Sequence, residues 1–257
     1  MTDSLDREGG GHGSQTLMRG LDLLDIVAQV GPIPLKALTD RIGLTRSTTH
    51  RLAAALVERN FLRLGVKGYE LGAKLLQLDA VARTHLSLPT LARPYLEDLA
   101  RLHGDAVNLA IREGGDIRYV DQVRGSRRVE IRSVIGERRP LASTGLGRAM
   151  LLDDGEAAWR AAFHDNPDRP GGVDAEVVWM GRMEIFKAQG AAFDVEENAD
   201  KVRCVAAPIR GASGAVVAAL SVSSVPQYMD DGRMAALVDP VRAAARAISI
   251  DLGWRPD

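Results

Sequence analysis

TRSTTHRLAAALVERN, residues Thr45 to Asn60, is the stretch that decides the fold. Its apolar residues recur three and four positions apart, which is typical of an amphipathic helix. We expect the buried side to consist of Leu52, Ala55, Leu56 and the stem of Arg59. The first turns carry hydroxyls and arginines, which suit phosphate oxygens and base edges because helix N-terminal amides attract anions. The segment therefore predicts a helix that lies on DNA.

Charge supports this interpretation. The whole chain has a net charge of -1, but between Thr45 and Lys67 five arginines and lysines accompany a single glutamate. Such a concentration fits a small phosphate footprint, although a charge run is more often a solvated face.

Composition indicates a globular protein. The 257 residues are 46% hydrophobic, enough to fill the core of one large domain or two smaller ones. The single cysteine, Cys204, excludes an intrachain disulfide framework, and no signal segment opens the chain. No apolar run approaches the roughly 20 residues of a membrane span. We expect a soluble cytoplasmic protein without a membrane partner.

The residues around Thr45 to Asn60 complete a small domain. The glycine-rich residues 1–13 are expected to be disordered, and a helix is expected from Thr16, with Leu17, Leu21, Leu24 and Ala28 at helical spacing. Pro34 opens a short second helix, which ends at the turn residue Gly43. Two short strands, 61–64 and 69–72, surround a tip that carries Lys67. Residues 14–72 therefore predict a winged helix-turn-helix.

The second half of the chain has a different pattern. Residues 73–87 read as a linker helix, and residues 88–257 as a second domain. Pro94 is expected to open a helix with Leu96, Leu99 and Leu102 inward. Residues 106–113 and 116–123 alternate around Gly114 and Gly115, which indicates a hairpin.

Later elements are expected at the following positions: a strand at 128–134, helices at 147–152, 156–163 and 173–189, strands at 203–209 and 215–224, and a final helix from about 230 to 252. The predicted class is α+β, with a mostly antiparallel sheet and helices on its faces. Many small-molecule sensing domains have this form.

The order of these elements and several strings resemble the isocitrate lyase regulator (IclR) family of bacterial transcription factors. The strings are RGLDLLDIVA, LKALTDRIGLTRSTTHRLAAALVERNFL, YELGAKLLQL, PLASTGLGRAML, DVEENADKVRCVAAPI and GAVVAALSVSS. The resemblance implies a headpiece that binds double-stranded operator DNA, a helical linker that dimerises headpieces, and a GAF-like effector-binding domain that closes over a small organic acid. It also implies a homodimer, which in this family is often paired into a tetramer.

The resemblance also implies site residues. The positions that match the family's DNA contacts are Arg46, Ser47, Thr48, His50 and Arg51, with Lys67 on the wing. The positions that match its effector pocket are Ile131, Gly145, Asp194, Val202, Cys204, Ser221 and Ser223, of which Ile131 and Val202 would form apolar walls. Ser221 and Ser223 point the same way on a strand, and Cys204 on a neighbouring strand could face them.

Three positions leave alternatives open. Many family members carry a histidine just before the small residues of the effector loop, whereas this chain reads Leu141 to Gly145 without one. Arg128 could bind a second acid group or point to solvent. Asp194 could accept a ligand hydroxyl or cap a helix that begins at Glu196.

The main hypothesis is a ligand-responsive repressor of a catabolic operon. The competing hypothesis is a metabolic enzyme or a binding module formed by residues 105–256, with the headpiece serving assembly, but it leaves the Arg46 to Arg51 cluster unexplained. There is no CxxC pair and no HExxH, and the glycine-rich strings lack the lysine of a phosphate-binding loop. We expect no catalysis and no cofactor, while a zinc site assembled from distant residues stays open.

Overall fold

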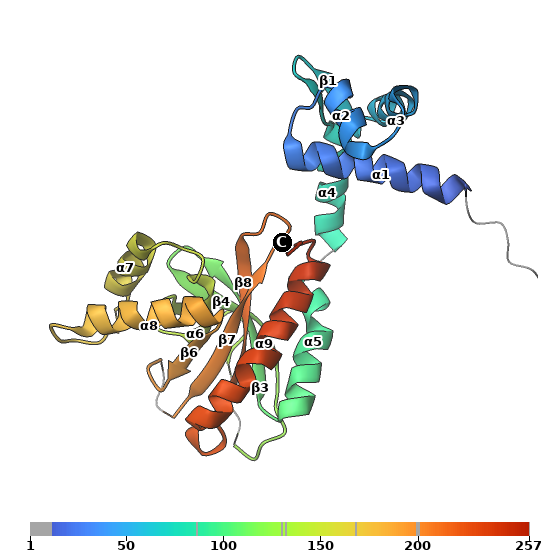
Figure 1. Cartoon of the computed structure of the whole chain (residues 1–257). Coiled ribbons are helices and arrows are strands. Elements are labelled where there is room, and N and C mark those ends of the chain that lie inside the picture. The colour runs from blue at the N-terminus through green and yellow to red at the C-terminus, as the bar shows by residue number, and fades with distance from the viewer. Residues whose placement is uncertain are drawn as a thin grey trace, which may run out of the picture. The chain divides into compact units, whose positions relative to one another are not determined.

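The structure of the chain is a computed structural model, which describes residues 12–85, 87–129, 131, 133–167, 169–198 and 201–256 (Figure 1). The chain divides into two compact units between residues 86 and 87. Each unit is described by itself.

The first unit is a winged helix-turn-helix followed by one more helix. Its elements are α1 (His12–Val30), α2 (Leu35–Ile42), α3 (Arg46–Glu58), β1 (Leu62–Gly65), β2 (Gly68–Leu71) and α4 (Ala73–His85). Strands β1 and β2 are antiparallel and form the wing, with Leu62 opposite Leu71. The predicted winged helix-turn-helix fold is confirmed. Helix α1 begins at His12, earlier than the helix expected from Thr16, and residues 1–11 of the expected disordered segment lie outside the described residues.

The core of the headpiece lies where α1, α2, α3 and the wing meet. It is formed by Leu23, Val27, Ile33, Leu38, Ala53, Leu62 and Tyr69. On α3 the expected buried side is partly wrong, because Ala55 and Arg59 are exposed and Thr49 and Ala53 are buried instead. Thr49 can be buried because its hydroxyl donates a hydrogen bond to the carbonyl oxygen of Thr45 at 3.0 Å.

Helix α1 also presents a different face from the one that its leucine spacing suggests. Leu23 and Val27 are the residues buried in the core, whereas Leu17 and Leu21 are 64% and 47% exposed. The helix therefore carries two apolar stripes, and only one of them packs within the headpiece.

Two glycines set the path of the backbone in the headpiece. Gly43 ends α2 with a φ of 69°, in the left-handed region that favours glycine. Gly68 has a φ of 126°, and a Cβ atom there would lie 2.3 Å from the carbonyl oxygen of Ile33. Ile33 and Tyr69 exchange backbone hydrogen bonds of 3.1 and 2.9 Å, which tie the wing to the connection between α1 and α2.

The second unit is an antiparallel sheet with helices on both faces, as expected. Its elements are α5 (Leu88–His103), β3 (Ala106–Glu113), β4 (Asp116–Val123), β5 (Arg138–Pro140), α6 (Gly145–Met150), α7 (Glu156–Asp165), α8 (Ala175–Gln189), β6 (Ala192–Val195), β7 (Arg203–Arg210), β8 (Val216–Ser224), the 3-10 helix η1 (Pro226–Tyr228) and α9 (Asp231–Asp251). The strand order is β5-β4-β3-β8-β7-β6. Among the described residues, no helix has both the length and the apolar character needed to cross a membrane.

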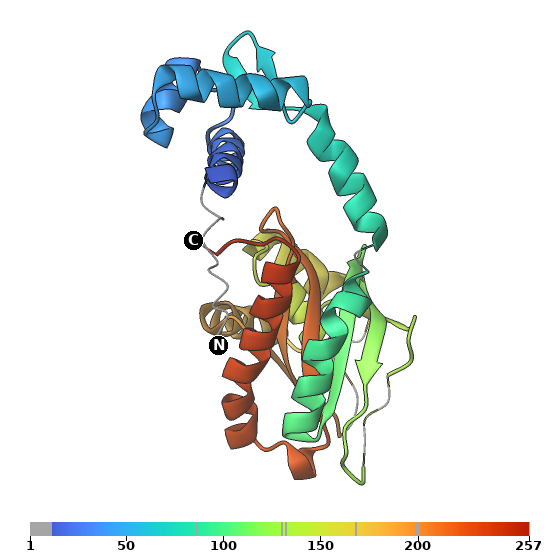
Figure 2. The ribbon, with the colours of Figure 1, turned by 90° about the vertical axis from the view of Figure 1, so that its right-hand side faces the viewer.

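Helices α5 and α9 run side by side over one face of the sheet (Figures 1 and 2), and α6 packs on the other face, with α7 and α8 completing that layer. One core contains Leu96, Leu109, Val205, Leu220 and Val241, and the other contains Ile117, Leu151, Trp159, Met183 and Ala206. Because both faces are covered, β8 reads as a nearly continuous run of apolar and small residues.

Helix α5 begins six residues before the expected start at Pro94. Ser87 precedes it, Pro89 lies in its first turn, and Pro94 lies inside the helix. A proline in the first turn costs no hydrogen bond, because the amides there have no helical partner. Leu102, expected inward, is 66% exposed, and Ala92 and Ala100 are buried instead.

The sheet edges differ most from expectation. The described residues of 128–134 form no strand, and the edge strand β5 lies at Arg138–Pro140, opposite β4. Strand β6, which the sequence did not reveal, pairs with β7 and places Asp194 opposite Cys204. Both edge strands are short, so neither shows the sequence period of a longer strand.

Replacing Gly147 with alanine is expected to destabilise the second unit by roughly 2–3 kcal/mol. A Cβ atom at Gly147 would lie 2.1 Å from the carbonyl oxygen of Leu141, and that contact can be relieved only by moving backbone. Gly181 is the matched control, because it is exposed on α8 with nothing within 4 Å of an added Cβ. Gly181→Ala should instead stabilise by about 0.5–1 kcal/mol.

Urea unfolding followed by tryptophan fluorescence measures this difference. All three tryptophans of the chain, Trp159, Trp179 and Trp254, lie in the second unit and report on it alone. Equal unfolding midpoints for the two variants would refute the close packing of α6 against Leu141.

Candidate functional site

The N-terminal half of α3 is a capped helix start. The Thr45 hydroxyl oxygen accepts a hydrogen bond from the backbone amide of Thr48 at 3.3 Å, and it also lies 3.1 Å from the hydroxyl oxygen of Ser47. This cap fixes Arg46 as the first helical residue. The helix dipole therefore adds positive potential where the arginines begin.

The residues nominated for DNA contact form one face of α3. Arg46 and His50 are four residues apart, as are Ser47 and Arg51, so the four side chains are neighbours on the helix surface. All four are exposed, and Thr48 beside them is half-buried. Arg46, His50 and Arg51 have no hydrogen-bond or ion-pair partner in the described part of the chain. Their donors are available to an external acceptor.

Lys67 lies at the tip of the wing between β1 and β2, and it is exposed. Strand β1 packs on α3, and β2 is tied to Ile33, so the wing is held against the headpiece at its base. Its neighbour Val66 is completely exposed, which leaves the tip open to a partner.

The second unit contains a partly open cavity of about 120 Å³ on the sheet face that α6 covers. Six of the seven predicted effector residues line it: Ile131, Asp194, Val202, Cys204, Ser221 and Ser223. Gly145 is not in the lining but borders it, because a Cβ atom there would lie 2.5 Å from the sulfur of Cys204. Arg128 is exposed and outside the lining.

Three adjacent strands position the polar floor of the cavity. In the sheet register Ser221 lies opposite Asn108 on β3, and Ser223 lies opposite Cys204 on β7. The Asn108 amide nitrogen donates to the Ser223 hydroxyl at 3.2 Å, and the two serine hydroxyls lie 3.4 Å apart. The hydroxyls are therefore held in a buried hydrogen-bonded row.

Asp194 is a buried carboxyl group at the side of this row. One of its oxygens accepts hydrogen bonds from the backbone amides of Glu197 at 3.0 Å and Asn198 at 3.3 Å. It caps a turn and not a helix, because Glu196, Glu197 and Asn198 are not helical. Burial raises the pKa of Asp194 to about 6, and the two amide hydrogen bonds and Arg148 oppose that shift only in part.

Cys204 is buried opposite Asp194 in the sheet. Burial raises the pKa of its thiol well above the usual range, so the thiol stays protonated at neutral pH. A protonated, enclosed thiol is a poor nucleophile and a poor metal ligand. The described residues contain no group of three or more histidine, cysteine, aspartate or glutamate side chains that could hold a metal ion.

Several lining residues were missed by the sequence analysis. They are Asn108, Tyr119, Ser133, Glu137, Arg139, Thr144, Leu146 and Asn198. Asn108 could have been found, because it interrupts the apolar run of β3. Arg139 supplies the cationic group of the lining. Its Nη2 atom lies 2.6 Å from the Oε1 atom of Glu137, with which it forms an ion pair. Burial raises the pKa of Tyr119 to about 12, so its hydroxyl is a neutral donor at physiological pH.

A winged helix-turn-helix with free cations on its third helix, joined in one chain to an α+β unit with a small polar cavity, defines a DNA-binding regulator with an effector domain. Comparison with known proteins agrees. The family description "IclR helix-turn-helix domain" matches residues 16–64, and "Bacterial transcriptional regulator IclR C-terminal" matches residues 80–250. The chain belongs to the IclR family of transcriptional regulators.

Individual relatives are similar along almost their whole length. The HTH-type transcriptional regulator XynR of Escherichia coli is 28% identical, over 93% of this chain and 98% of its own. The acetate operon repressor of Salmonella typhimurium is 30% identical, over 93% and 90%. The crystal structure of the Agobacterium tumefaciens repressor BlcR is 26% identical, with a TM-score of 0.70 over 94% and 98%. These relatives are regulators and not enzymes, which removes the enzyme hypothesis.

Proposed function

We propose that this protein is a repressor that releases operator DNA when a small organic acid enters the cavity of its second unit, and that it controls a catabolic operon. The observation that carries the proposal is that one chain joins the exposed cationic face of α3 to a unit with a small polar cavity. The similar proteins from Salmonella typhimurium and Agobacterium tumefaciens are both named repressors, the first of them of an acetate operon.

On the DNA side, Arg46, Ser47, Thr48, His50 and Arg51 contact the major groove. Arginine can bond the O6 and N7 atoms of guanine with two hydrogen bonds, and the hydroxyls can bond phosphates or base edges. Lys67 on the wing contacts the neighbouring phosphate backbone or minor groove.

On the effector side, the size and chemistry of the cavity favour a compact acid. Its volume of about 120 Å³ is well below the roughly 300 Å³ at which pockets for drug-sized ligands begin. Ser221, Ser223 and Arg139 offer donors to a carboxylate. Asp194 accepts a hydrogen bond from a hydroxyl group of the ligand, and Ile131 and Val202 pack against the apolar part of the ligand. A short hydroxy or keto acid has these features.

We further propose a homodimer, and pairing of two dimers into a tetramer as the higher state. Leu17, Met18 and Leu21 on α1 and Leu76 and Leu78 on α4 are apolar and between 45% and 73% exposed. Clusters of exposed apolar residues are typical of protein interfaces. A dimer also gives two recognition helices, which reach half-sites about one DNA turn apart.

In this account, the acid acts through the spacing of the two headpieces. It binds one arrangement of the dimer more tightly than the other, because only unequal affinity can shift the equilibrium. A changed spacing breaks the phosphate contacts of both headpieces at once, which explains release.

Filling the cavity tests the proposal. The double variant Ser221→Leu and Ser223→Leu should bind operator DNA as the wild type does, but an acid that releases the wild type should have no effect on it, because the leucine side chains occupy the effector volume. Ser213→Leu is the control, since Ser213 lies in the exposed turn between β7 and β8. Fluorescence anisotropy of labelled operator DNA measures both properties. A normal response in the double variant would exclude this cavity as the effector site.

A further inference from the structure

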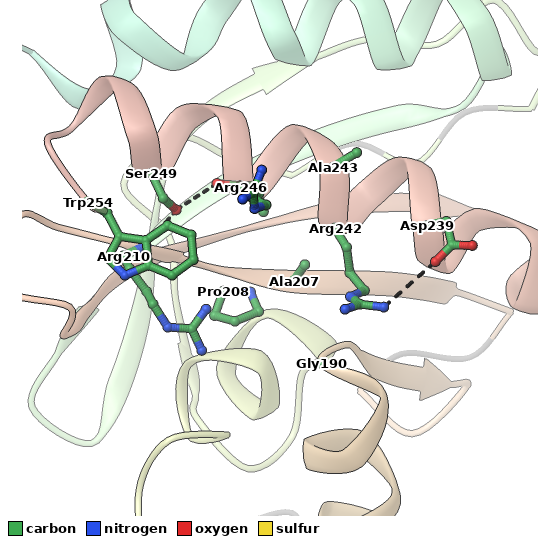
Figure 3. A pocket seen from close by; sticks show the side chains of 11 residues that line it. Gly190, Ala207, Pro208, Arg210, Asp239, Arg242, Ala243, Arg246, Ser249 and Trp254 are labelled. Atoms are coloured by element: carbon green, nitrogen blue, oxygen red, sulfur yellow. Dashed lines mark hydrogen bonds and ion pairs between the residues drawn. The ribbon is translucent and has the colours of Figure 1, made fainter. Parts of the chain in front are cut away.

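A second hollow lies on the other face of the same unit, between α9, the end of β7 and the turn after α8 (Figure 3). It is an open groove of about 480 Å³ that shares no lining residue with the effector cavity. Three arginines line it, together with Trp254 and Asp239.

The groove exists because the edge of the sheet is uncovered there. Pairing between β6 and β7 ends at Ala206, so Ala207 to Arg210 have no strand on that side in the described part of the chain. Pro208 has no amide hydrogen, and the Arg210 amide donates to the Ser249 hydroxyl at 2.9 Å. This edge therefore cannot accept an added peptide strand with a regular hydrogen-bond ladder. A ligand in the groove would therefore be bound by side chains and not by the backbone of this edge.

At one end of the groove Arg210 is held in a fixed position. Two of its nitrogens lie 3.0 and 2.7 Å from the two carboxylate oxygens of Asp153, and its guanidinium lies 5.6 Å from the centre of the Trp254 ring. Figure 3 shows Arg210 beside Trp254. This end presents an ordered cation and an aromatic surface.

The other two arginines, Arg242 and Arg246, have weak counter-charges or none among the described residues. The Nη1 atom of Arg242 lies 3.7 Å from the Oδ1 atom of Asp239. The Asp239 side chain is 93% exposed, so this ion pair is weak and is screened by solvent. Arg246 is exposed and has no hydrogen-bond or ion-pair partner among the described residues. The two are four residues apart on α9, about 6 Å along the helix, and like charges at this spacing repel.

The backbone at Gly190 passes close to the side chain of Arg242 in the groove. Gly190 ends α8 with a φ of 67°, and a Cβ atom there would lie 3.2 Å from the Nε atom of Arg242. The Arg242 guanidinium reaches down over this turn (Figure 3). A side chain at position 190 would crowd it, so the glycine leaves room for a cation directed into the groove.

We propose that this groove is a second ligand site, for a small molecule that carries two or more anionic groups, either carboxylates or phosphates. One anionic group binds between Arg242 and Arg246, where it relieves their repulsion, and another part of the ligand lies against Arg210 and Trp254. Arginine binds both kinds of oxyanion through paired hydrogen bonds. The site is separate from the effector cavity and does not depend on the proposed repressor function.

Isothermal titration calorimetry of the full-length protein tests the site, with citrate as the carboxylate probe and pyrophosphate as the phosphate probe, at constant ionic strength. We expect saturable binding of at least one probe, and its identity assigns the anion class. The double variant Arg242→Gln and Arg246→Gln should bind that probe roughly tenfold more weakly. Both residues are exposed, so the fold should persist, which circular dichroism checks.

Two further variants separate the possible outcomes. Arg124→Gln removes an exposed arginine of the same unit that lies outside the groove and has no partner among the described residues, and it should leave binding unchanged. The variant Ser221→Leu and Ser223→Leu should also retain binding, because it blocks only the effector cavity. Absence of saturable binding, or unchanged affinity in the Arg242 and Arg246 double variant, would overturn the proposal. So would loss of binding in the cavity variant alone, which would place the anion in the cavity.

Discussion

Replacing both Arg46 and Arg51 with alanine is expected to weaken operator binding about a hundredfold or more. Each bidentate arginine contact to guanine is worth about 1–3 kcal/mol, and two such losses add when the contacts are separate. Both side chains are exposed and have no partner in the described residues, so their removal costs the folded headpiece little. Affinity for the acid, measured without DNA, should be unchanged.

The matched control is Arg101→Ala, which removes an exposed arginine of the second unit that pairs only with Asp98 among the described residues. Anisotropy titrations at several salt concentrations compare the three proteins. The double variant should also show a shallower dependence of affinity on salt, because fewer phosphates are neutralised. Wild-type affinity in the double variant would show that α3 does not read the operator through this face.

The affinity for an organic acid is expected to fall roughly tenfold or more as the pH rises through about 6. Burial raises the pKa of Asp194 to about 6, so its carboxyl group is mostly neutral at pH 5 and charged at pH 7. The free acid is ionised over this whole range, because carboxylic acids titrate near pH 4. At pH 7 the carboxylates of the ligand and of Asp194 therefore repel each other in a small cavity, whereas at pH 5 Asp194 can donate a hydrogen bond.

Asp194→Asn isolates this effect. The asparagine side-chain oxygen can still accept the hydrogen bonds from the amides of Glu197 and Asn198, so the turn after β6 should persist. Calorimetric titrations with one acid at pH 5, 6, 7 and 8 should show a much flatter pH dependence for the variant. The same decline in both proteins would mean that another group controls the pH dependence.

The headpiece could be predicted well because its signals are local. The threonine that caps α3 and the left-handed Gly43 each act within a few residues. Helical spacing alone could not say which apolar stripe of α1 is buried, since Leu17 and Leu23 are both apolar and only contact with α2, α3 and the wing selects Leu23.

The cavity could be predicted only in part, for a related reason. Ser221 and Ser223 are polar residues in an apolar strand, and such a signal is visible in the sequence. Arg139 and Tyr119 join them through β4 and β5, and Asp194 joins them through β6. Pairing of β6 with β7 and of β5 with β4 follows from the tertiary fold, because strands of three or four residues carry no distinctive period.

The central claim is that one chain binds specific DNA and responds to a small acid. Fluorescence anisotropy of the full-length protein on the DNA upstream of its own gene tests it most directly, with a shuffled sequence as control and with individual organic acids added. We predict saturable binding that is selective over the shuffled sequence and is lost when one acid is added. Equal affinity for the two DNAs, or selective binding that no organic acid changes, would contradict the account.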